Sequence, residues 1–412
     1  MILLQCVVPL LASAQALTLD ECRRLAHDNY PAVKQYGLIE QSRDFTVENA
    51  AKGWLPRVSA QAGGYAFTDV LKTSAQMQAV GIDIKNQLLS GSLTVTQPLY
   101  DGGQISAQKH LAEAEAEVDK SQLGVTLYDL NQRIEQLYFG TLLYDEQLAQ
   151  NHLLQSDLAI SHGSVAAMMK GGIANQTDLD AVSVEEVKAR QQQASLQAQR
   201  RAYLAVLGTF IGRQLGEQTQ LQRPPLVDIA GWTAAAVQRP ELDSYTAQTR
   251  LLDVRRQQLD TRLRPTVSAF GMGMLHSQVS DMVKNGMLVG GLTVSWNIGA
   301  LYTRKNDIKK LQTQRLLIDT QRETFLFNNR LQNESTGGTV ESLRTLIGQD
   351  DEIVSLRERI RSKSEKKVQL GTESVNEMLR DINAVSEARQ QKVLHEIQLL
   401  QALYQIKNLN NH

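Results

Sequence analysis

The segment Gly91-Ser-Leu-Thr-Val-Thr96 recurs about 200 residues later as Gly290-Gly-Leu-Thr-Val-Ser295. Two further segments repeat at about the same offset. Trp54–Ala60 is echoed by Arg262–Ala269, and Lys170–Leu179 is echoed by Leu370–Leu379. Three matches in the same order define one long tandem repeat. We therefore predict two structural repeats, residues 17–212 and 232–412, joined by a linker at 213–231.

Each repeat is predicted to contain one pair of strands, over 57–98 in the first and 266–299 in the second. Residues 57–70, 86–98, 266–279 and 287–299 carry β-type sequence. The alternation is clearest in the last of these segments, where one face is apolar and the other is polar. The apolar positions are Leu288, Leu292, Val294, Trp296 and Ile298, and the polar ones are Thr293, Ser295 and Asn297.

Long helical hairpins follow the strands, at 101–212 and 301–409. No proline occurs between Pro98 and Pro224 or after Pro265, and good helix formers dominate both segments. The descending helices, 104–170 and 301–369, would each be roughly 100 Å long. Narrow apolar stripes in the returning helices, near 176–212 and 374–409, favour coiled-coil seams. One such stripe is Leu379, Ile382, Val385, Val393, Ile397, Leu400 and Leu403.

Glycines and prolines mark the expected breaks. Helix breaks are expected at Gly124, Gly140, Gly337, Gly338 and Gly348, and a further helix is expected over 19–53. Gly171, Gly172 and Gly371 are predicted to turn the hairpins. The predicted strand–helix junctions are Pro56, Pro98, Gly102, Gly103 and Pro265, because proline ends helices and glycine tolerates positive φ. A phosphate-binding loop is the rival interpretation of Asp101-Gly-Gly103, but no Lys-Ser/Thr follows the glycines.

The charge balance argues against binding to nucleic acid. Lys plus Arg number 43 and Asp plus Glu 44, so the net charge of −1 gives no field for binding nucleic acid.

Residues 1–16 resemble a short signal peptide without its positive n-region, which suggests a truncated start. A buried strand is the alternative for this segment. Cys6 would leave with the signal peptide, or less plausibly carry a lipid anchor, and Cys22 is expected to pack as a small apolar residue on a helix.

Four strands per chain cannot close a barrel, and open sheet edges do not persist in lipid. Three chains would supply twelve strands, an even number within the range of outer-membrane barrels. The predicted fold is therefore mainly α with a membrane β portion. Tandem-duplicated long α-helical hairpins would form a trimeric α-barrel, and four β-strands per chain would contribute to a shared twelve-stranded β-barrel.

Thr18–Ala26 with Asn29-Tyr-Pro31 resembles the opening helix of a known family, the TolC-type outer-membrane efflux proteins. Gln97–Gly103, leading into Ala112–Ala116, is similar to the strand-to-helix junction. Gly172-Ile173, Thr177-Asp-Leu179 and Glu185–Arg190 are similar to the tip of a helical hairpin. The match covers nearly the whole chain, although Trp296-Asn-Ile-Gly-Ala300 departs from the junction pattern.

This resemblance implies a homotrimeric exit duct in the outer membrane with a long periplasmic extension, in contact with outer-membrane lipid. It further implies a periplasmic adaptor (membrane fusion) protein that docks at the hairpin tips, and an inner-membrane pump of RND or ABC type that supplies the energy. The expected tip contacts are Gly171, Gly172, Ile173, Gly371, Thr372 and Glu373. By the same resemblance, polar contacts would hold the periplasmic mouth of the duct closed. The chain departs from the family at Glu373, where a basic residue is frequent, and at Arg380, which aligns with a gate aspartate in the best-known member.

Carboxylates follow both predicted tips, and rings of carboxylates select cations in pores. The candidate gate residues are Asp178, Asp180, Glu377, Arg380 and Asp381. Solvated acids favoured by the helix dipole are an equally good interpretation of the carboxylates. Four aromatic residues at the strand–helix junctions suggest a membrane-interface girdle, with core packing as the alternative: Trp54, Tyr100, Trp296 and Tyr302.

The predicted function is a passive channel of a tripartite efflux or type I secretion system, without enzymatic activity. The sequence has no nucleophile elbow, Walker loop or dinucleotide fingerprint, and its histidines form no pair at metal-ligand spacing, so no cofactor is expected. A soluble periplasmic coiled-coil scaffold or adaptor is the alternative. It explains the long helices but not the two strand pairs with one apolar face.

Overall fold

The computed structural model describes residues 16–66, 87–227, 237–276 and 286–411. Most of the predicted signal peptide and the end of the predicted linker lie outside these ranges. The chain divides into two compact units. Unit 1 comprises Met1–Gln35, Leu123–Leu242 and Glu323–His412, and unit 2 comprises Tyr36–Gln122 and Asp243–Arg322. Each unit takes segments from both predicted repeats, and the repeat boundaries stay a prediction.

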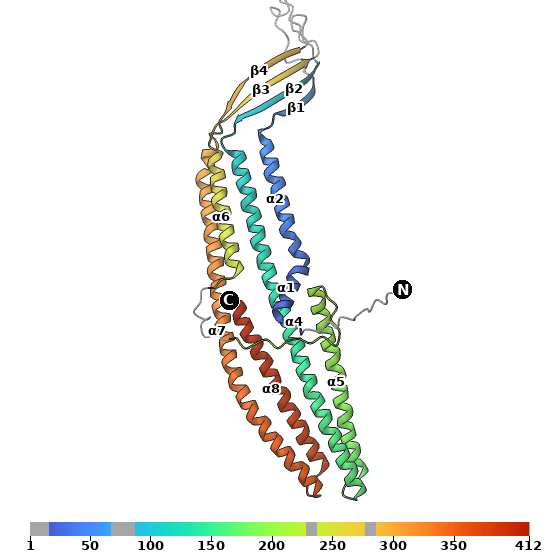
Figure 1. Cartoon of the computed structure of the whole chain (residues 1–412). Helices are drawn as coiled ribbons and strands as arrows, with labels where there is room; N and C mark the ends of the chain where they lie inside the picture. Colours follow the sequence, from blue (N-terminus) through green and yellow to red (C-terminus); the bar gives the residue numbers. More distant parts are fainter. Residues whose placement is uncertain (1–15, 67–86, 228–236, 277–285, 412) are drawn as a thin grey trace, which may run out of the picture. The chain divides into compact units, whose positions relative to one another are not determined.

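Unit 2 contains an antiparallel sheet in the order β1-β2-β3-β4 (Figure 1). Its strands are β1 (Arg57–Ala66), β2 (Gln87–Tyr100), β3 (Thr266–His276) and β4 (Gly286–Ser295). Strands β2 and β3 pair directly, which joins the two predicted strand pairs into one sheet. A register shift between Pro98 and Tyr100 marks the end of β2, at a predicted junction.

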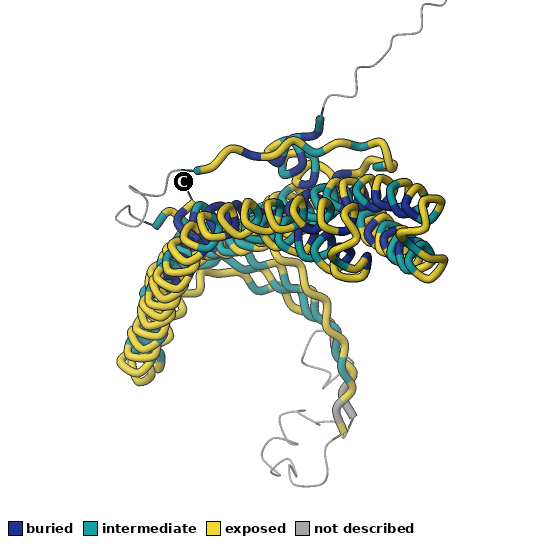
Figure 2. Tube along the Cα trace, turned by 90° about the horizontal axis from the view of Figure 1, so that it is seen from below, coloured by how far each residue is buried: buried dark blue, intermediate teal, exposed yellow. Residues whose placement is uncertain are grey.

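The strand register gives the sheet two different faces, because directly paired residues point to the same side. One face is apolar or glycine at almost every described position. It carries Val58, Ala60, Ala62, Leu89, Leu93, Val95, Val267, Ala269, Leu275, Leu288, Leu292 and Val294. The opposite face carries Ser, Thr, Gln and Arg, together with a few apolar residues of β3 and β4. Figure 2 shows only exposed and half-buried residues along the described strands.

The helices of unit 2 lie in a row that ion pairs connect. These are α2 (Gln35–Ala51), the first part of α4 (Gln104–Lys170), α6 (Pro240–Thr261) and the first part of α7 (Ala300–Gln369). Lys120 on α4 pairs with Glu40 on α2 at 2.5 Å. Arg255 on α6 pairs with Glu115 on α4 at 3.3 Å. Arg304 on α7 pairs with Asp260 on α6 at 2.8 Å, so α2 and α7 occupy the two ends of the row.

Unit 1 contains α1 (Leu19–Asn29), the remaining parts of α4 and α7, α5 (Gln176–Ile211) and α8 (Val375–Asn410). The predicted stripe on α8 is confirmed, since all seven of its residues are buried. One core cluster surrounds Tyr138 and Phe139, and another joins α4, α5, α7 and α8 near the hairpin ends. Cys22 is buried in the first cluster, as predicted. Among the described helices, none combines the length and the hydropathy of a transmembrane span.

The prediction of one continuous helix over 19–53 is wrong. The chain instead forms α1, a 3-10 turn at Pro31–Lys34, α2 and a second 3-10 turn at Lys52–Trp54. Proline disfavours the helical conformation of the residue before it, and Tyr30 accordingly has an extended backbone with ψ of 123°. Strand β4 also ends earlier than predicted. From Trp296 onward the backbone hydrogen bonds are local, as in Ala300 N–H to the Asn297 carbonyl at 3.3 Å.

The predicted glycine breaks in the long helices are also wrong, because α4 and α7 continue over 67 and 70 residues. Gly140 has a packing role instead. A Cβ atom placed on it would lie 2.3 Å from Cε1 of Tyr203, so its small size lets α5 approach α4. Gly337, Gly338 and Gly348 have open space around them. Their cost of about 1 kcal/mol each is smaller than the stabilisation that a long packed helix supplies.

Candidate functional site

The turns between α4 and α5 and between α7 and α8 have the same construction. Gly172 has a φ of +75° and Gly371 a φ of +71°, the left-handed conformation that glycine adopts without strain. Ile173 N–H donates to the Met168 carbonyl at 3.0 Å, and Thr372 N–H donates to the Lys367 carbonyl at 2.9 Å. Each turn is thus a Schellman motif, which satisfies carbonyl groups at the end of the descending helix. Gly171, by contrast, has no positive φ.

Both ascending helices begin with a capping box three residues after the left-handed glycine. The Asn175 side chain accepts from Asp178 N–H at 3.1 Å, and Asp178 Oδ2 accepts from Asn175 N–H at 3.0 Å. In α8 the Ser374 hydroxyl accepts from Glu377 N–H at 3.3 Å, and Glu377 Oε2 accepts from Ser374 N–H at 3.1 Å. These reciprocal bonds satisfy donors that a helix start otherwise leaves unpaired.

Two of the predicted gate carboxylates therefore have a local structural role. The hydrogen bonds from the backbone and hydroxyl of Ser374 lower the pKa of Glu377 from its usual 4.5, since they favour the charged form. Asp180 is also engaged locally, because it accepts from the Gln176 side chain at 2.8 Å. Asp178 and Glu377 thus each form part of a capping box at a helix start.

Arg380 and Asp381 differ from the capping acids. Their side chains make no hydrogen bond or ion pair with the part of the chain that the structure describes; Arg380 is exposed and Asp381 half-buried. Glu373 forms an ion pair with Lys367 at 3.6 Å. Its Oε2 atom is buried without a hydrogen-bond partner among the described residues. Arg380 and Asp381 thus remain free to pair with groups outside the chain.

The two hairpin tips lie next to each other in unit 1. A Cβ atom placed on Gly371 would lie 3.8 Å from Cγ2 of Ile173, in ordinary van der Waals contact. Ile173 and Leu370 nevertheless keep 59% and 78% of their surface exposed. The tips therefore present uncovered apolar side chains beside the polar groups Thr372 and Glu373.

The strand–helix junction at Asp101 confirms its predicted sharp turn. Gly102 and Gly103 have φ values of +68° and +88°. Asp101 Oδ1 accepts from Gly103 N–H at 2.9 Å, and its Oδ2 accepts from Ile105 N–H at 2.6 Å, so the carboxylate caps α4. The corresponding junction before α7 uses a different contact, in which the Trp296 indole donates to the Leu263 carbonyl at 2.9 Å.

The four predicted girdle aromatics all lie in unit 2 and are partly or largely exposed. The exposed fractions are 42% for Trp54, 46% for Tyr100, 59% for Trp296 and 85% for Tyr302. These fractions exclude the alternative that they are core residues of the single chain. Pro56 and Pro265 directly precede β1 and β3, as predicted.

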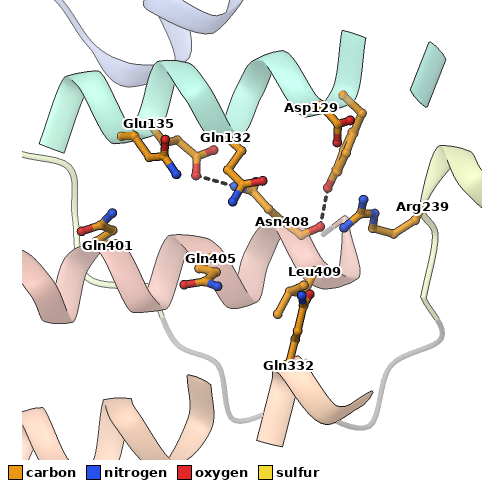
Figure 3. A pocket seen from close by; sticks show the side chains of 11 residues that line it. Asp129, Gln132, Glu135, Arg239, Gln332, Gln401, Gln405, Asn408 and Leu409 are labelled. Carbon is orange, nitrogen blue, oxygen red and sulfur yellow. Dashed lines mark hydrogen bonds between the residues drawn. The ribbon is translucent and has the colours of Figure 1, made fainter. Parts of the chain in front are cut away.

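A polar cavity of about 260 Å³ lies between α4, α7 and α8 within unit 1 (Figure 3). Glu135 there accepts hydrogen bonds from the side chains of Arg23 and Asn408. Burial raises the pKa of Glu135, and Arg23 opposes that shift. Arg239 pairs with Glu241 and stacks over a neighbouring aromatic ring. Glu135 and Arg239 thus have charged partners within the chain, and we assign no ligand to the cavity.

Comparison with solved structures identifies the architecture. The outer-membrane channel OprN matches with a TM-score of 0.69 at 12% identity, over 95% of this chain and 89% of its own. The CmeC outer membrane channel of Campylobacter jejuni matches with a TM-score of 0.67 at 11% identity, over 95% and 85%. The open state of the Neisseria gonorrhoeae MtrE outer membrane channel matches with a TM-score of 0.67 at 11% identity, over 95% and 88%. This chain has the fold of an outer-membrane channel.

No family model and no curated protein matches the sequence. The fold agrees with the architecture that the resemblance to TolC-type efflux proteins implies. The fold contains the hairpin tips and the strand–helix junctions, the regions to which the sequence assigns the candidate site residues.

Within this outer-membrane-channel fold, one polar network was missed by sequence reasoning. Arg361 on α7 forms two hydrogen bonds to Asp157 on α4, at 2.6 and 3.0 Å, and a third to Glu365 at 2.8 Å. Arg389 on α8 pairs with Glu358 at 2.5 Å and approaches Asp157 at 3.9 Å. The network connects the first hairpin with the second. Asp157 and Arg361 are 204 positions apart, so no local spacing could have indicated the pair.

Proposed function

We propose that this chain is a subunit of an outer-membrane channel that conducts substrates passively to the cell exterior. The main support for this proposal is that 95% of the chain, including its sheet and both helical hairpins, matches solved outer-membrane channels. The proposed location is the outer membrane, with the helices extending into the periplasm. The chain carries no catalytic role in this proposal.

The apolar face of the sheet supports contact with lipid. Leu288, Leu292 and Val294 are 90%, 70% and 69% exposed in the single chain. Large apolar patches of this kind mark contact with a membrane or another protein. In the proposed assembly lipid covers this face, and the polar face lines the pore.

The two ends of unit 2 support assembly with further copies of the chain. At one end, α2 exposes the acids Asp44 and Glu48 beside Leu38 and Phe45. At the other end, α7 exposes Lys305, Lys309 and Lys310 on the turns before the exposed residues Leu316 and Leu317. The edge strands β1 and β4 have no second strand partner among the described residues. Opposite charges and open sheet edges at the two ends favour a head-to-tail ring of chains. The ring that we propose is a homotrimer with a twelve-stranded barrel.

The hairpin tips are the proposed mouth and docking site. Asp178, Asp180, Glu377 and Asp381 would line it with carboxylates, and Arg380 would pair with a neighbouring copy. The exposed Ile173 would contact a periplasmic adaptor, as would the neighbouring positions Gly171, Gly172, Gly371, Thr372 and Glu373. The inner-membrane pump of the proposed tripartite efflux or type I secretion system would be of RND or ABC type.

The decisive experiment combines location with mass. The chain is expressed with a complete signal peptide, the membranes are separated, and the protein extracted in detergent is sized. Recovery from the outer membrane as a trimer is the expected result. A soluble monomer or dimer would contradict the channel and favour a periplasmic scaffold or adaptor.

A second experiment addresses the mouth. Single-channel conductance is compared between the unmodified chain and the variants Asp381→Asn and Asp178→Asn. Loss of cation selectivity in the Asp381→Asn variant is expected. A smaller effect is expected for Asp178→Asn, because the Asp178 carboxylate is held in a capping box. Unchanged selectivity in both variants would remove these acids from the proposed ring.

A further inference from the structure

Methionine is concentrated on the β3–β4 hairpin. The chain has 9 methionines in 412 residues, and Met272, Met274, Met282 and Met287 fall within a segment of 16 residues, 272–287. Met282 lies outside the described residues. The other three belong to β3 and β4, which are neighbours in the sheet (Figure 1).

The strand register places these three methionines on one face. Met274 pairs directly with Met287, and Met272 pairs with Val289. Met272 and Met274 are two positions apart on the same strand, so their side chains share a side. This side is the polar face of the sheet, where Met274 lies opposite Ser92 and Met272 opposite Thr94 of β2. The three methionines thus lie beside Phe270 and Val289 and next to the hydroxyl groups of β2.

The spacing suits convergence on one ion. Directly opposed Cβ atoms lie roughly 5 Å apart, and positions i and i+2 of a strand lie about 7 Å apart. Methionine has three rotatable bonds beyond Cα, so its sulfur atom can move by several ångströms. Three sulfur atoms from these positions can therefore meet at a common point above the strands.

We propose that Met272, Met274 and Met287 form a binding site for a soft monovalent cation, Cu(I) or Ag(I), through their three thioether sulfurs. Thioethers are soft, uncharged ligands that select Cu(I) and similar ions. Calcium and magnesium require oxygen ligands, and zinc prefers thiolate, imidazole or carboxylate. The paired positions on β2 offer only hydroxyl groups. Within the described ranges, no group of His, Cys, Asp and Glu side chains is placed to hold a metal ion.

The site is accessible to an ion. Met287 keeps 51% of its surface exposed, and Met272 and Met274 are half-buried. Phe270 lies on the same face, two positions before Met272, where its ring can stabilise a bound cation. The site itself needs only the β3–β4 hairpin. Its position in the pore rests on the proposed channel function.

Titration with Ag(I) tests the proposal, because Ag(I) does not change its oxidation state during the measurement. The full chain is purified in detergent with Cys6→Ala and Cys22→Ala, so that no thiol competes, in nitrate buffer without chloride. Isothermal titration is expected to give one Ag(I) per chain. The Met272→Leu/Met274→Leu/Met287→Leu variant is expected to bind at least about tenfold more weakly, because leucine keeps the volume but offers no ligand.

A matched control replaces three methionines of unit 1, Met168, Met169 and Met378, with leucine and is expected to bind Ag(I) as before. Equal binding by the hairpin variant, or no binding by the cysteine-free chain, would overturn the proposal. Oxidation of the cysteine-free chain by hydrogen peroxide gives a readout that needs no hairpin variant. One equivalent of Ag(I) should slow sulfoxide formation at the three hairpin methionines and leave Met169 unaffected. Equal oxidation rates with and without Ag(I) would also contradict the site.

The outcome is separable from the proposed channel function. Trimeric recovery of the hairpin variant from the outer membrane tests the assembly without reference to metal. A trimer that does not bind Ag(I) would contradict the metal site alone, whereas a soluble chain that binds Ag(I) would contradict the channel alone.

Discussion

At the scale of single residues, Gly140 allows α5 to pack against α4. We expect Gly140→Ala to destabilise the protein by about 1–3 kcal/mol, because the added methyl group would overlap the Tyr203 ring. Gly163 is the matched control on the same helix, since nothing lies within 4 Å of its Cβ position. Gly163→Ala should stabilise by about 0.5–1 kcal/mol through helix propensity. Denaturant unfolding in detergent measures both, and effects of equal sign would contradict the packing role.

Cys22 gives a second prediction at this scale. Burial raises the pKa of its thiol to about 12, and the charge of Glu21 adds to the shift. Because the thiolate is the reactive form, the folded protein should react with maleimide at pH 8 very slowly, and the unfolded protein rapidly. Mass spectrometry of a Cys6→Ala variant follows the modification of Cys22 alone. Rapid labelling in the folded state would show that α1 opens frequently.

At the scale of elements, the capping box of α8 predicts a dependence on pH. The hydrogen bonds from Ser374 lower the pKa of Glu377 below its usual 4.5, so the charged form stabilises the folded helix start. This contribution is complete above pH 4.5 and is lost as the pH falls through the lowered pKa. Amide exchange over Val375–Met378 should therefore accelerate on acidification beyond its intrinsic pH dependence. A Glu377→Gln variant should lack that additional change, and equal profiles would refute the assignment.

The network around Asp157 yields a prediction about how the two hairpins hold together. Arg361 and Asp157 are 17% and 20% exposed, so their bidentate pair is partly shielded from solvent. A double-mutant cycle with Asp157→Ala and Arg361→Ala should give a coupling free energy of about 1 kcal/mol. Lys188 and Glu185, an i,i+3 pair whose lysine is 63% exposed, provide the control cycle. Its coupling should be below about 0.5 kcal/mol. Equal coupling free energies in the two cycles would mean that the network contributes no more than an exposed ion pair.

Some features of these elements could be predicted from the sequence alone, and others could not. The absence of proline predicted α4 and α7, and the residues from Gly172 to Asp178 predicted a turn followed by a helix start. These features depend on local chemistry. The packing of Tyr203 against Gly140 joins positions more than 60 residues apart, and the Asp157–Arg361 pair joins two separate hairpins. Local propensities carry no information about such contacts, which is why the role of Gly140 and the network were missed.

At the scale of the whole molecule, the apolar face of the sheet and the exposed tips have no partner within one chain. The strand alternation predicted that face because the period of two is itself local. What covers it is not a property of the single chain. The gate assignment has the same limit, since Arg380 and Asp381 make no ion pair with the described part of the chain. Their roles stay predictions that only the assembled protein can test.

The opposite charges at the two ends of unit 2 make the proposed assembly testable. Glu48 at the α2 end and Lys309 at the α7 end form no ion pair among the described residues. Glu48→Lys or Lys309→Glu alone should speed dissociation of the trimer severalfold at low salt, because exposed pairs contribute about 0.2–1 kcal/mol each. The combined reversal should restore much of the lost stability, since it re-creates opposite charges. In 1 M salt, where the Debye length is about 3 Å, the single variants should behave like the unmodified chain. Size-exclusion chromatography and heated gel electrophoresis follow the trimer. Failure of the double reversal to recover stability would mean that these two ends do not meet in the assembly.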